Sequence, residues 1–213
     1  MKIVIVEDEL LFLDVLLKAC AKEFGHEIVG VAGTGREALD VVPATAPDLL
    51  ILDLKLPDSH GLDILELLRL KQALLRTLVI SSSCDEYTVY RVEQAAVQGF
   101  LHKSTNTVTE LALAIAAIEA GTTYFSPAYR QARLDRSLNP LAFDKVLTAR
   151  EQTVLALLGE PMSDIEIALK LGLSPETIEK HRFNIMHKLS LNTRVETARY
   201  ARRCGLTRPT APL

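Results

Sequence analysis

Hydrophobic and polar positions follow two different periods along the first 120 residues. Short apolar runs predict strands, and stretches in which apolar residues recur every three or four positions predict helices. The runs cover residues 2–7, 27–32, 48–53, 77–82 and 99–103. The helical stretches cover residues 9–24, 34–43, 61–71, 86–98 and 107–120. Five strand–helix repeats predict a doubly wound α/β fold, a parallel sheet with helices on both faces.

The last third of the chain shows helical periodicity alone, interrupted by signals that start helices. Thr148, Ser163 and Thr193 each stand three residues before a glutamate, which is the pattern of a capping box. Ser174 is followed by Pro175, a second kind of helix start. These signals predict four helices near residues 149–158, 164–171, 175–189 and 194–204.

Residues 121–147 separate the two patterns. They have no clean period and contain two prolines, so we expect a linker with a short helix near 127–136. The predicted organisation is an α/β domain over 1–121, a linker over 122–146 and an all-α domain over 147–213. The first 147 residues carry 20 acidic and 14 basic side chains, whereas the rest carry 7 and 10. A basic second domain favours contact with nucleic acid.

The composition is that of an ordinary soluble protein. Of the 213 residues, 48% are hydrophobic and 24% are charged. The three cysteines are widely spaced and odd in number, which fits reduced thiols. The sequence shows no signal peptide and no apolar window long enough to span a bilayer. We therefore expect a cytoplasmic protein without membrane contact.

Polar side chains follow four of the five predicted strands. Glu7 and Asp8 end the first, Asp53 the third, Ser81 the fourth and Lys103 the fifth. Because the carboxyl ends of parallel strands meet at one edge, we expect these side chains to lie together. Clustered carboxylates favour a hard cation such as Mg²⁺. A lysine can offset charge on a phosphoryl group, and a serine hydroxyl can donate to its oxygens. The set predicts phosphoryl transfer onto Asp53 as the nucleophile.

These residues, together with Leu56-Pro57 and Gly61, resemble the receiver domain of bacterial two-component response regulators over roughly residues 1–120. The resemblance implies a (βα)5 fold with strand order 2-1-3-4-5, an Mg²⁺ cofactor and a sensor histidine kinase as partner. It implies roles for the matching positions: Asp53 as phosphoacceptor; Glu7, Asp8, Asp53 and the backbone carbonyl of Lys55 as metal ligands; Ser81 and Lys103 on the phosphoryl group; Phe100 as the switch aromatic.

The loop after Asp53 departs from the family pattern. The family commonly has Met-Pro-Gly-Met-Asp-Gly there, whereas this chain has Leu56-Pro57-Asp58-Ser59-His60-Gly61. Phosphohydrolases of the haloacid dehalogenase type also use a strand-end aspartate. They usually carry a second acid two residues later as general acid/base, and here that position is Lys55. A phosphohydrolase is therefore the less favoured alternative. We expect no enzyme beyond autodephosphorylation.

Residues 147–201 are similar to the LuxR/NarL-type helix-turn-helix domain. The match runs through Leu147-Thr148-x-Arg150-Glu151, Leu173-Ser174-Pro175 and Asn184-Ile185-Met186-x-Lys188-Leu189. Steps of 100° per residue place Ile178, Ile185 and Leu189 on one buried stripe of the helix from 175. The remaining faces predict DNA contacts by Thr177, Lys180, Arg182, Phe183, Asn184, His187 and Lys188.

Two residues of this helix depart from the family, Glu179 in place of lysine and Phe183 in place of a small polar residue. The alternative interpretation is an amphipathic helix that packs onto another protein. The helix after Thr193 resembles the dimerisation helix of the family, with Val195, Ala198 and Ala201-Arg202 on one side.

Together the two resemblances predict a response-regulator transcription factor of the NarL/FixJ family. Phosphorylation of Asp53 would control homodimerisation and binding to double-stranded promoter DNA, with RNA polymerase as a further candidate partner. The alternative is a phosphorylation-independent DNA-binding regulator whose receiver domain is a dimer scaffold.

Overall fold

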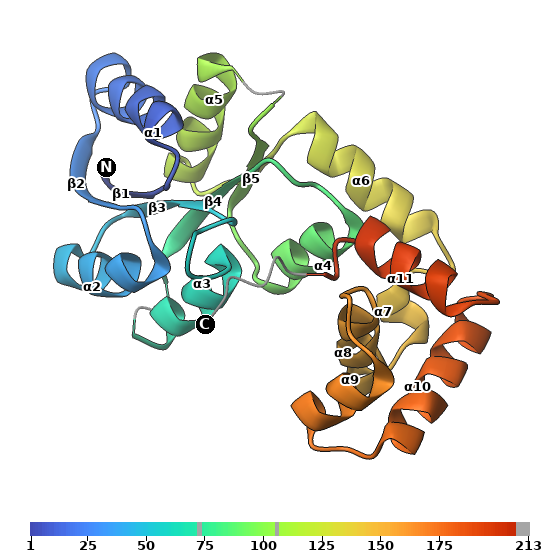
Figure 1. The fold of residues 1–213 in the computed structure, drawn as a ribbon. Coiled ribbons are helices and arrows are strands. Elements are labelled where there is room, and N and C mark those ends of the chain that lie inside the picture. Colours follow the sequence, from blue (N-terminus) through green and yellow to red (C-terminus); the bar gives the residue numbers. More distant parts are fainter. Residues whose placement is uncertain (72–73, 105–106, 208–213) are drawn as a thin grey trace. The chain divides into compact units, whose positions relative to one another are not determined.

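The computed structural model describes residues 1–71, 74–104 and 107–207. They form two compact units. Met1–Cys84 and Arg91–Gln131 make the first, and Asp85–Tyr90 with residues 132–207 make the second. The first is built around a sheet and the second is helical (Figure 1). The domain limits placed at residues 121 and 147 remain a prediction. In the described part of the chain, no helix is long and apolar enough to cross a membrane.

The sheet of the first unit has six parallel strands in the order β2-β1-β3-β4-β5-β6. The strands are β1 (Lys2–Val6), β2 (Glu27–Ala32), β3 (Leu49–Asp53), β4 (Arg76–Ser81), β5 (Gly99–His102) and β6 (Tyr124–Phe125). The predicted doubly wound sheet and its order 2-1-3-4-5 are confirmed. The sequence did not predict β6, because two residues are too few to show a strand period.

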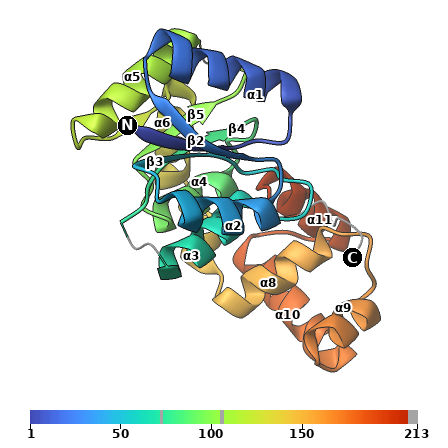
Figure 2. The same ribbon diagram turned by 90° about the vertical axis from the view of Figure 1, so that its left-hand side faces the viewer.

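Helices cover both faces of this sheet (Figures 1 and 2). They are α1 (Leu10–Leu17), continued by the π-helical turn η1 (Lys18–Glu23), α2 (Gly35–Thr45), α3 (Gly61–Lys71), α4 (Glu86–Gln94) and α5 (Val108–Glu119). α1 and α5 lie on one face, where Leu16 and Ile115 join Ile5 and Ile51 in a buried cluster. α2 and α3 lie on the other face. Every residue of β3 is buried, as a strand covered on both sides requires.

The second unit contains the predicted helices. They are α8 (Ala149–Leu158), α9 (Asp164–Leu171), α10 (Pro175–Lys188) and α11 (Arg194–Arg203), so the four-helix prediction is confirmed. A short helix, α7 (Phe143–Val146), precedes them and was not predicted. The helix expected near 127–136 is α6 (Pro127–Leu138), which begins in the first unit and ends in the second.

Helix caps explain why these segments start where they do. Thr148 and Ser163 form complete capping boxes with Glu151 and Glu166. The third predicted box is incomplete. Thr193 caps α11, but the carboxylate of Glu196 accepts from the backbone N–H of Asn192, at 2.7 Å, and not from Thr193.

The apolar side of these helices forms the core of the second unit. Ile178, Ile185 and Leu189 are buried, which confirms the predicted stripe on α10. Ala201 is also fully buried in this core. Ala201 therefore does not belong to an exposed dimerisation face, whereas Val195 is exposed.

Candidate functional site

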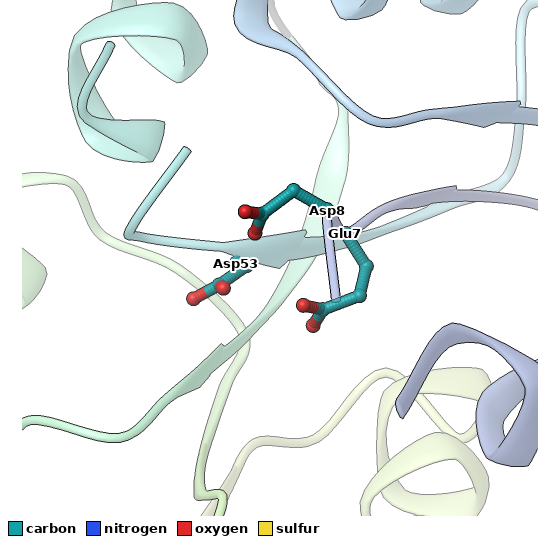
Figure 3. A group of neighbouring side chains, drawn as sticks. All are labelled: Glu7, Asp8 and Asp53. Atoms are coloured by element: carbon teal, nitrogen blue, oxygen red, sulfur yellow. The ribbon is translucent and has the colours of Figure 1, made fainter. Parts of the chain in front are cut away.

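Three carboxylates meet where β1 and β3 end. Glu7 and Asp8 directly follow β1, and Asp53 is the last residue of β3, its hydrogen-bonded neighbour. One carboxylate oxygen of each residue lies within 4.8 Å of the others (Figure 3). Glu7 is 1% exposed and Asp53 4% exposed, whereas Asp8 is exposed to solvent. The structure therefore brings together the acids that the strand ends predicted, with one side of the group open.

Lys103 supplies the countercharge for two of these acids. Its Nζ donates to Glu7 Oε1 at 2.8 Å and to Asp53 Oδ2 at 2.8 Å. The same Nζ lies 4.8 Å from the ring centre of Phe12, a residue of α1 that the sequence had marked only as part of a helical period. An ammonium held between two carboxylates and an aromatic face has little freedom to leave without a replacement cation.

The electrostatics of the group leave one oxygen available for a cation. Burial raises the pKa of Glu7, the hydrogen bond from Lys103 offsets part of that rise, and nearby Asp53 adds to it. Burial alone would lower the pKa of Lys103, but its hydrogen bonds to Asp53 and Glu7 outweigh this and raise it. Among the described residues, the buried Oε2 of Glu7 has no hydrogen-bond partner. An all-oxygen donor set with an unsatisfied buried oxygen suits Mg²⁺.

The other predicted residues of the site lie on adjacent elements. Ser81 ends β4 and is fully buried, and its Oγ accepts from the backbone N–H of Ser83 at 3.1 Å. The backbone N–H of Lys103 donates to the carbonyl of Ser81 at 2.8 Å, so the serine and the lysine are held side by side. The backbone N–H of Lys55 donates to Asp53 Oδ1 at 3.2 Å.

Phe100, the predicted switch aromatic, is fully buried in β5. Its ring lies 4.8 Å from that of Tyr129, centre to centre, in the first turn of α6, and Tyr129 also stacks on Phe125 of β6 at 5.0 Å. The sequence did not indicate Tyr129, because an aromatic residue in a segment without a period carries no signal of its own.

The predicted DNA-contacting residues of α10 fall into two groups. Lys180, Phe183 and His187 are exposed, with Phe183 at 68%, and Thr177 and Asn184 are half-buried. The remaining two are engaged within the second unit, because Lys188 Nζ donates to Glu151 Oε2 at 2.7 Å and Arg182 Nε to Asp164 Oδ2 at 3.2 Å. DNA contacts by Arg182 and Lys188 remain a prediction that these ion pairs do not favour.

Two protein families match the chain in tandem. Residues 3–116 match the response regulator receiver domain, and residues 145–201 match the family of bacterial regulatory proteins named after LuxR. The first match contains all the predicted site residues of the sheet edge, and the second contains α10.

Known proteins share both parts in the same order. The transcriptional regulatory protein MctR of Rhizobium johnstonii is 31% identical over 206 residues, which cover 94% of this chain and 92% of MctR. The transcriptional regulatory protein UhpA of Escherichia coli is 31% identical over 197 residues, covering 92% and 95%. Among solved structures, RcsB of Salmonella enterica serovar Typhimurium, bound to a promoter with BeF₃⁻, shares the fold. Its TM-score is 0.69 at 23% identity, with 94% and 97% of the two chains covered. The chain therefore belongs to the NarL/FixJ family of two-component response regulators, transcription factors in which a LuxR-type DNA-binding domain follows the receiver domain.

Proposed function

We propose that Asp53 accepts a phosphoryl group from a sensor histidine kinase, and that this modification controls dimerisation and promoter binding. The observation that carries the proposal is the buried pair of Asp53 and Glu7 held by one lysine, with Asp8 open to solvent beside them. Apolar side chains at this strand edge would stabilise the fold at least as well as three acids and a lysine, so stability alone does not explain these residues. They suit the chemistry of a transferred, highly charged group.

In the proposed transfer, a carboxylate oxygen of Asp53 attacks phosphorus, and the bond from phosphorus to the donor imidazole nitrogen breaks as the new P–O bond forms. Lys103 moves its hydrogen bond from the Asp53 carboxylate to a phosphoryl oxygen, and the Ser81 hydroxyl donates to another. Glu7, Asp8, Asp53 and the Lys55 carbonyl would hold Mg²⁺, which supplies positive charge against the phosphoryl oxygens. The acyl phosphate is later lost by hydrolysis at the same site.

The contact between Phe100 and Tyr129 supports a route from this site to the linker. Phe100 lies on β5, which pairs with β4, and it stands opposite Val79, two residues before Ser81. A fully buried ring cannot change position without moving the ring packed against it, because interiors are close-packed. Movement of Phe100 would therefore shift Tyr129 and the start of α6, the helix that leads into the second unit.

The output we propose is binding of double-stranded promoter DNA through α10. Ser174 caps the helix start, where its Oγ accepts from the backbone N–H of Thr177 at 3.2 Å and shares a hydrogen bond with the Thr177 hydroxyl at 3.1 Å. A phosphate contact by the Thr177 hydroxyl would replace the second of these bonds, while Lys180, Phe183, Asn184 and His187 would face base edges. The promoter-bound RcsB structure, similar in fold, supports this output. A homodimer would present two such helices about 34 Å apart on one face of DNA. Such a regulator acts in the cytoplasm, where RNA polymerase is a further proposed partner.

The first test is covalent labelling. Asp53→Asn should abolish labelling by acetyl phosphate carrying a labelled phosphoryl group, with the thermal unfolding midpoint unchanged or raised. Asp40→Asn, at an exposed position on α2, is the matched control and should be labelled like the unmodified protein. Undiminished labelling of Asp53→Asn would sink the assignment of the phosphoacceptor.

The second test separates control by phosphorylation from constitutive DNA binding. The mass in solution and the affinity for promoter DNA are measured with and without BeF₃⁻ and Mg²⁺. A larger mass and tighter binding with BeF₃⁻ support the proposal. Equal binding in both states identifies the phosphorylation-independent regulator, with the receiver domain as a scaffold. Turnover of an added phosphoester such as p-nitrophenyl phosphate would instead identify a phosphohydrolase.

A further inference from the structure

The loop that departs from the family pattern reaches across to another helix. The carboxylate of Asp58 accepts two backbone hydrogen bonds at the start of α2, from Gly35 at 2.8 Å and from Arg36 at 3.0 Å. The hydroxyl of Ser59 donates to the same carboxylate at 2.9 Å. Asp58 therefore joins the β3–α3 loop to α2, which lies more than 20 residues away along the chain.

The loop itself is a closed turn with Lys55 at its base. Lys55 and His60 face each other in an isolated antiparallel bridge, and the backbone N–H of Leu56 donates to the carbonyl of Ser59 at 3.2 Å. His60 Nδ1 accepts from the backbone N–H of Leu62 at 3.3 Å, which caps the start of α3. Because these hydrogen bonds hold the turn together, a shift of Asp58 at its tip would also shift the backbone of Lys55 at its base.

Both ends of this turn depend on close backbone approach. A Cβ on Gly35 would lie 2.0 Å from Ser59 Oγ, and a Cβ on Gly61 would lie 2.2 Å from the carbonyl oxygen of Asp53. At Gly61 the obstacle is backbone, so only glycine permits the contact, whereas at Gly35 the side chains of Ser59 and Ile64 would have to move. The loop therefore packs closely against Gly35 of α2 at Ser59 and against the backbone of Asp53 at Gly61.

We propose that Asp58 is a positioning residue for phosphoryl transfer. By tying the loop to α2, it holds the backbone of Lys55, whose N–H donates to Asp53 and whose carbonyl would complete the Mg²⁺ ligands. The inference rests on the proposed function. Mg²⁺ demands near-ideal octahedral geometry, so a carbonyl that is free to drift is a poor ligand. Asp58, Ser59 and His60 thus replace the family's usual residues with a tether and two local hydrogen bonds.

The chain offers a matched control, because α2 has a second cap that does not touch the loop. The hydroxyl of Thr34 accepts from the backbone N–H of Glu37 at 3.1 Å. Thr34→Ala and Asp58→Ala should both weaken the start of α2 and lower the thermal midpoint by similar amounts. Only Asp58→Ala should release the loop, and Asp58→Asn, which keeps one acceptor oxygen, should lie between.

The measurement is metal affinity of the full chain without any phosphodonor. Mn²⁺ binding is followed by electron paramagnetic resonance and Mg²⁺ by displacement of Mn²⁺. Supporting ligands outside the metal's own shell affect affinity by about tenfold or more. We therefore expect Asp58→Ala to bind about tenfold more weakly, Asp58→Asn severalfold more weakly, and Thr34→Ala like the unmodified protein.

Each outcome decides between the claims. Equal affinity of Asp58→Ala and Thr34→Ala would show that Asp58 is only a helix cap and would overturn the inference. In that case labelling of Asp53 by acetyl phosphate still stands as a separate result for the proposed function. If the unmodified protein binds neither Mn²⁺ nor Mg²⁺, the proposed function itself fails and the inference with it. A loss of affinity confined to the two Asp58 variants supports it.

Discussion

Each of the two units buries a glutamate against a lysine, but the pKa of one glutamate is raised and that of the other is lowered. Glu7 is 1% exposed and lies 2.8 Å from Lys103, and Glu151 is 4% exposed and lies 2.7 Å from Lys188. Yet burial raises the pKa of Glu7 beyond what Lys103 offsets, whereas the pKa of Glu151 is lowered. For Glu151 burial acts upward too, but Lys188 and the backbone and hydroxyl of Thr148 outweigh it.

The difference comes from what else each carboxylate contacts. Among the described residues, Lys188 forms an ion pair with Glu151 alone. Glu151 also accepts from the N–H and the Oγ–H of Thr148, at 2.8 and 3.0 Å, through the capping box. Glu7 shares its lysine with Asp53 and keeps one buried oxygen unpaired among the described residues. A fully satisfied buried charge stabilises its unit, whereas a buried carboxylate with an unpaired oxygen destabilises its unit unless a cation binds it.

The largest expected effect comes from removing the shared lysine. Lys103→Met leaves two buried carboxylates without countercharge. Without Mg²⁺ we expect the free energy of unfolding of the first unit to fall by about 2 to 3 kcal/mol, somewhat less than for a fully enclosed pair. Mg²⁺ should recover most of the loss and bind more tightly than to the unmodified protein, because its competitor is gone. Denaturant unfolding with and without Mg²⁺ measures both. Lys22→Met, at an exposed side chain of η1, is the control.

The paired glutamates give a test with opposite signs. A carboxyl group with a lowered pKa stabilises the folded protein fully above the ordinary value of 4.5, and this stabilisation is lost as pH falls from 4.5 through the lowered pKa. Glu151→Gln should therefore lower stability at neutral pH by about 1.5 kcal/mol, with the difference disappearing below pH 4.5. A raised pKa destabilises above its own value. Glu7→Gln should therefore stabilise the metal-free protein at neutral pH, with the gain fading as pH falls towards 4.5.

Hydrogen exchange of backbone amides in β1 and α8 separates the two units in this experiment. If Glu7→Gln and Glu151→Gln changed the stability of their units in the same direction, the contrast between the two sites would be contradicted. Adding Mg²⁺ should stabilise the unmodified protein more than Glu7→Gln, because a neutral amide oxygen is a weaker ligand than a carboxylate, and so reverse the sign of the difference. It should leave the effect of Glu151→Gln unchanged.

The smallest expected effect distinguishes two lysines on α10. Lys180 is exposed, and Lys180→Met should weaken promoter binding by about 1 kcal/mol and reduce the salt dependence of the affinity by about one charge. Lys188→Met should chiefly lower stability, because Glu151 loses its partner. Fluorescence anisotropy of labelled DNA at several salt concentrations, beside thermal unfolding, measures the two effects. A larger loss of DNA affinity for Lys188→Met than for Lys180→Met would reverse the ranking of the two positions.

Much of the fold was predictable because its signals are local. The strands and helices were predicted from the period of their apolar residues. The helix starts at Thr148 and Ser163 were predicted from a glutamate three residues later. The gathering of Glu7, Asp8, Asp53 and Lys103 was predictable for a topological reason, since parallel strands bring their carboxyl ends to one edge. The strand β6 escaped prediction because its two residues are defined only by their pairing with β5.

By itself, the sequence determined the order of elements and the two families, and it predicted which acids and which lysine would gather at the sheet edge. Only the tertiary structure decided how each charged side chain is satisfied. Lys188 meets Glu151 across 37 residues, and Asp58 meets Gly35 across 23. Period and capping act within a few residues along the chain, whereas these partners are chosen by packing, which brings together positions that no local pattern relates.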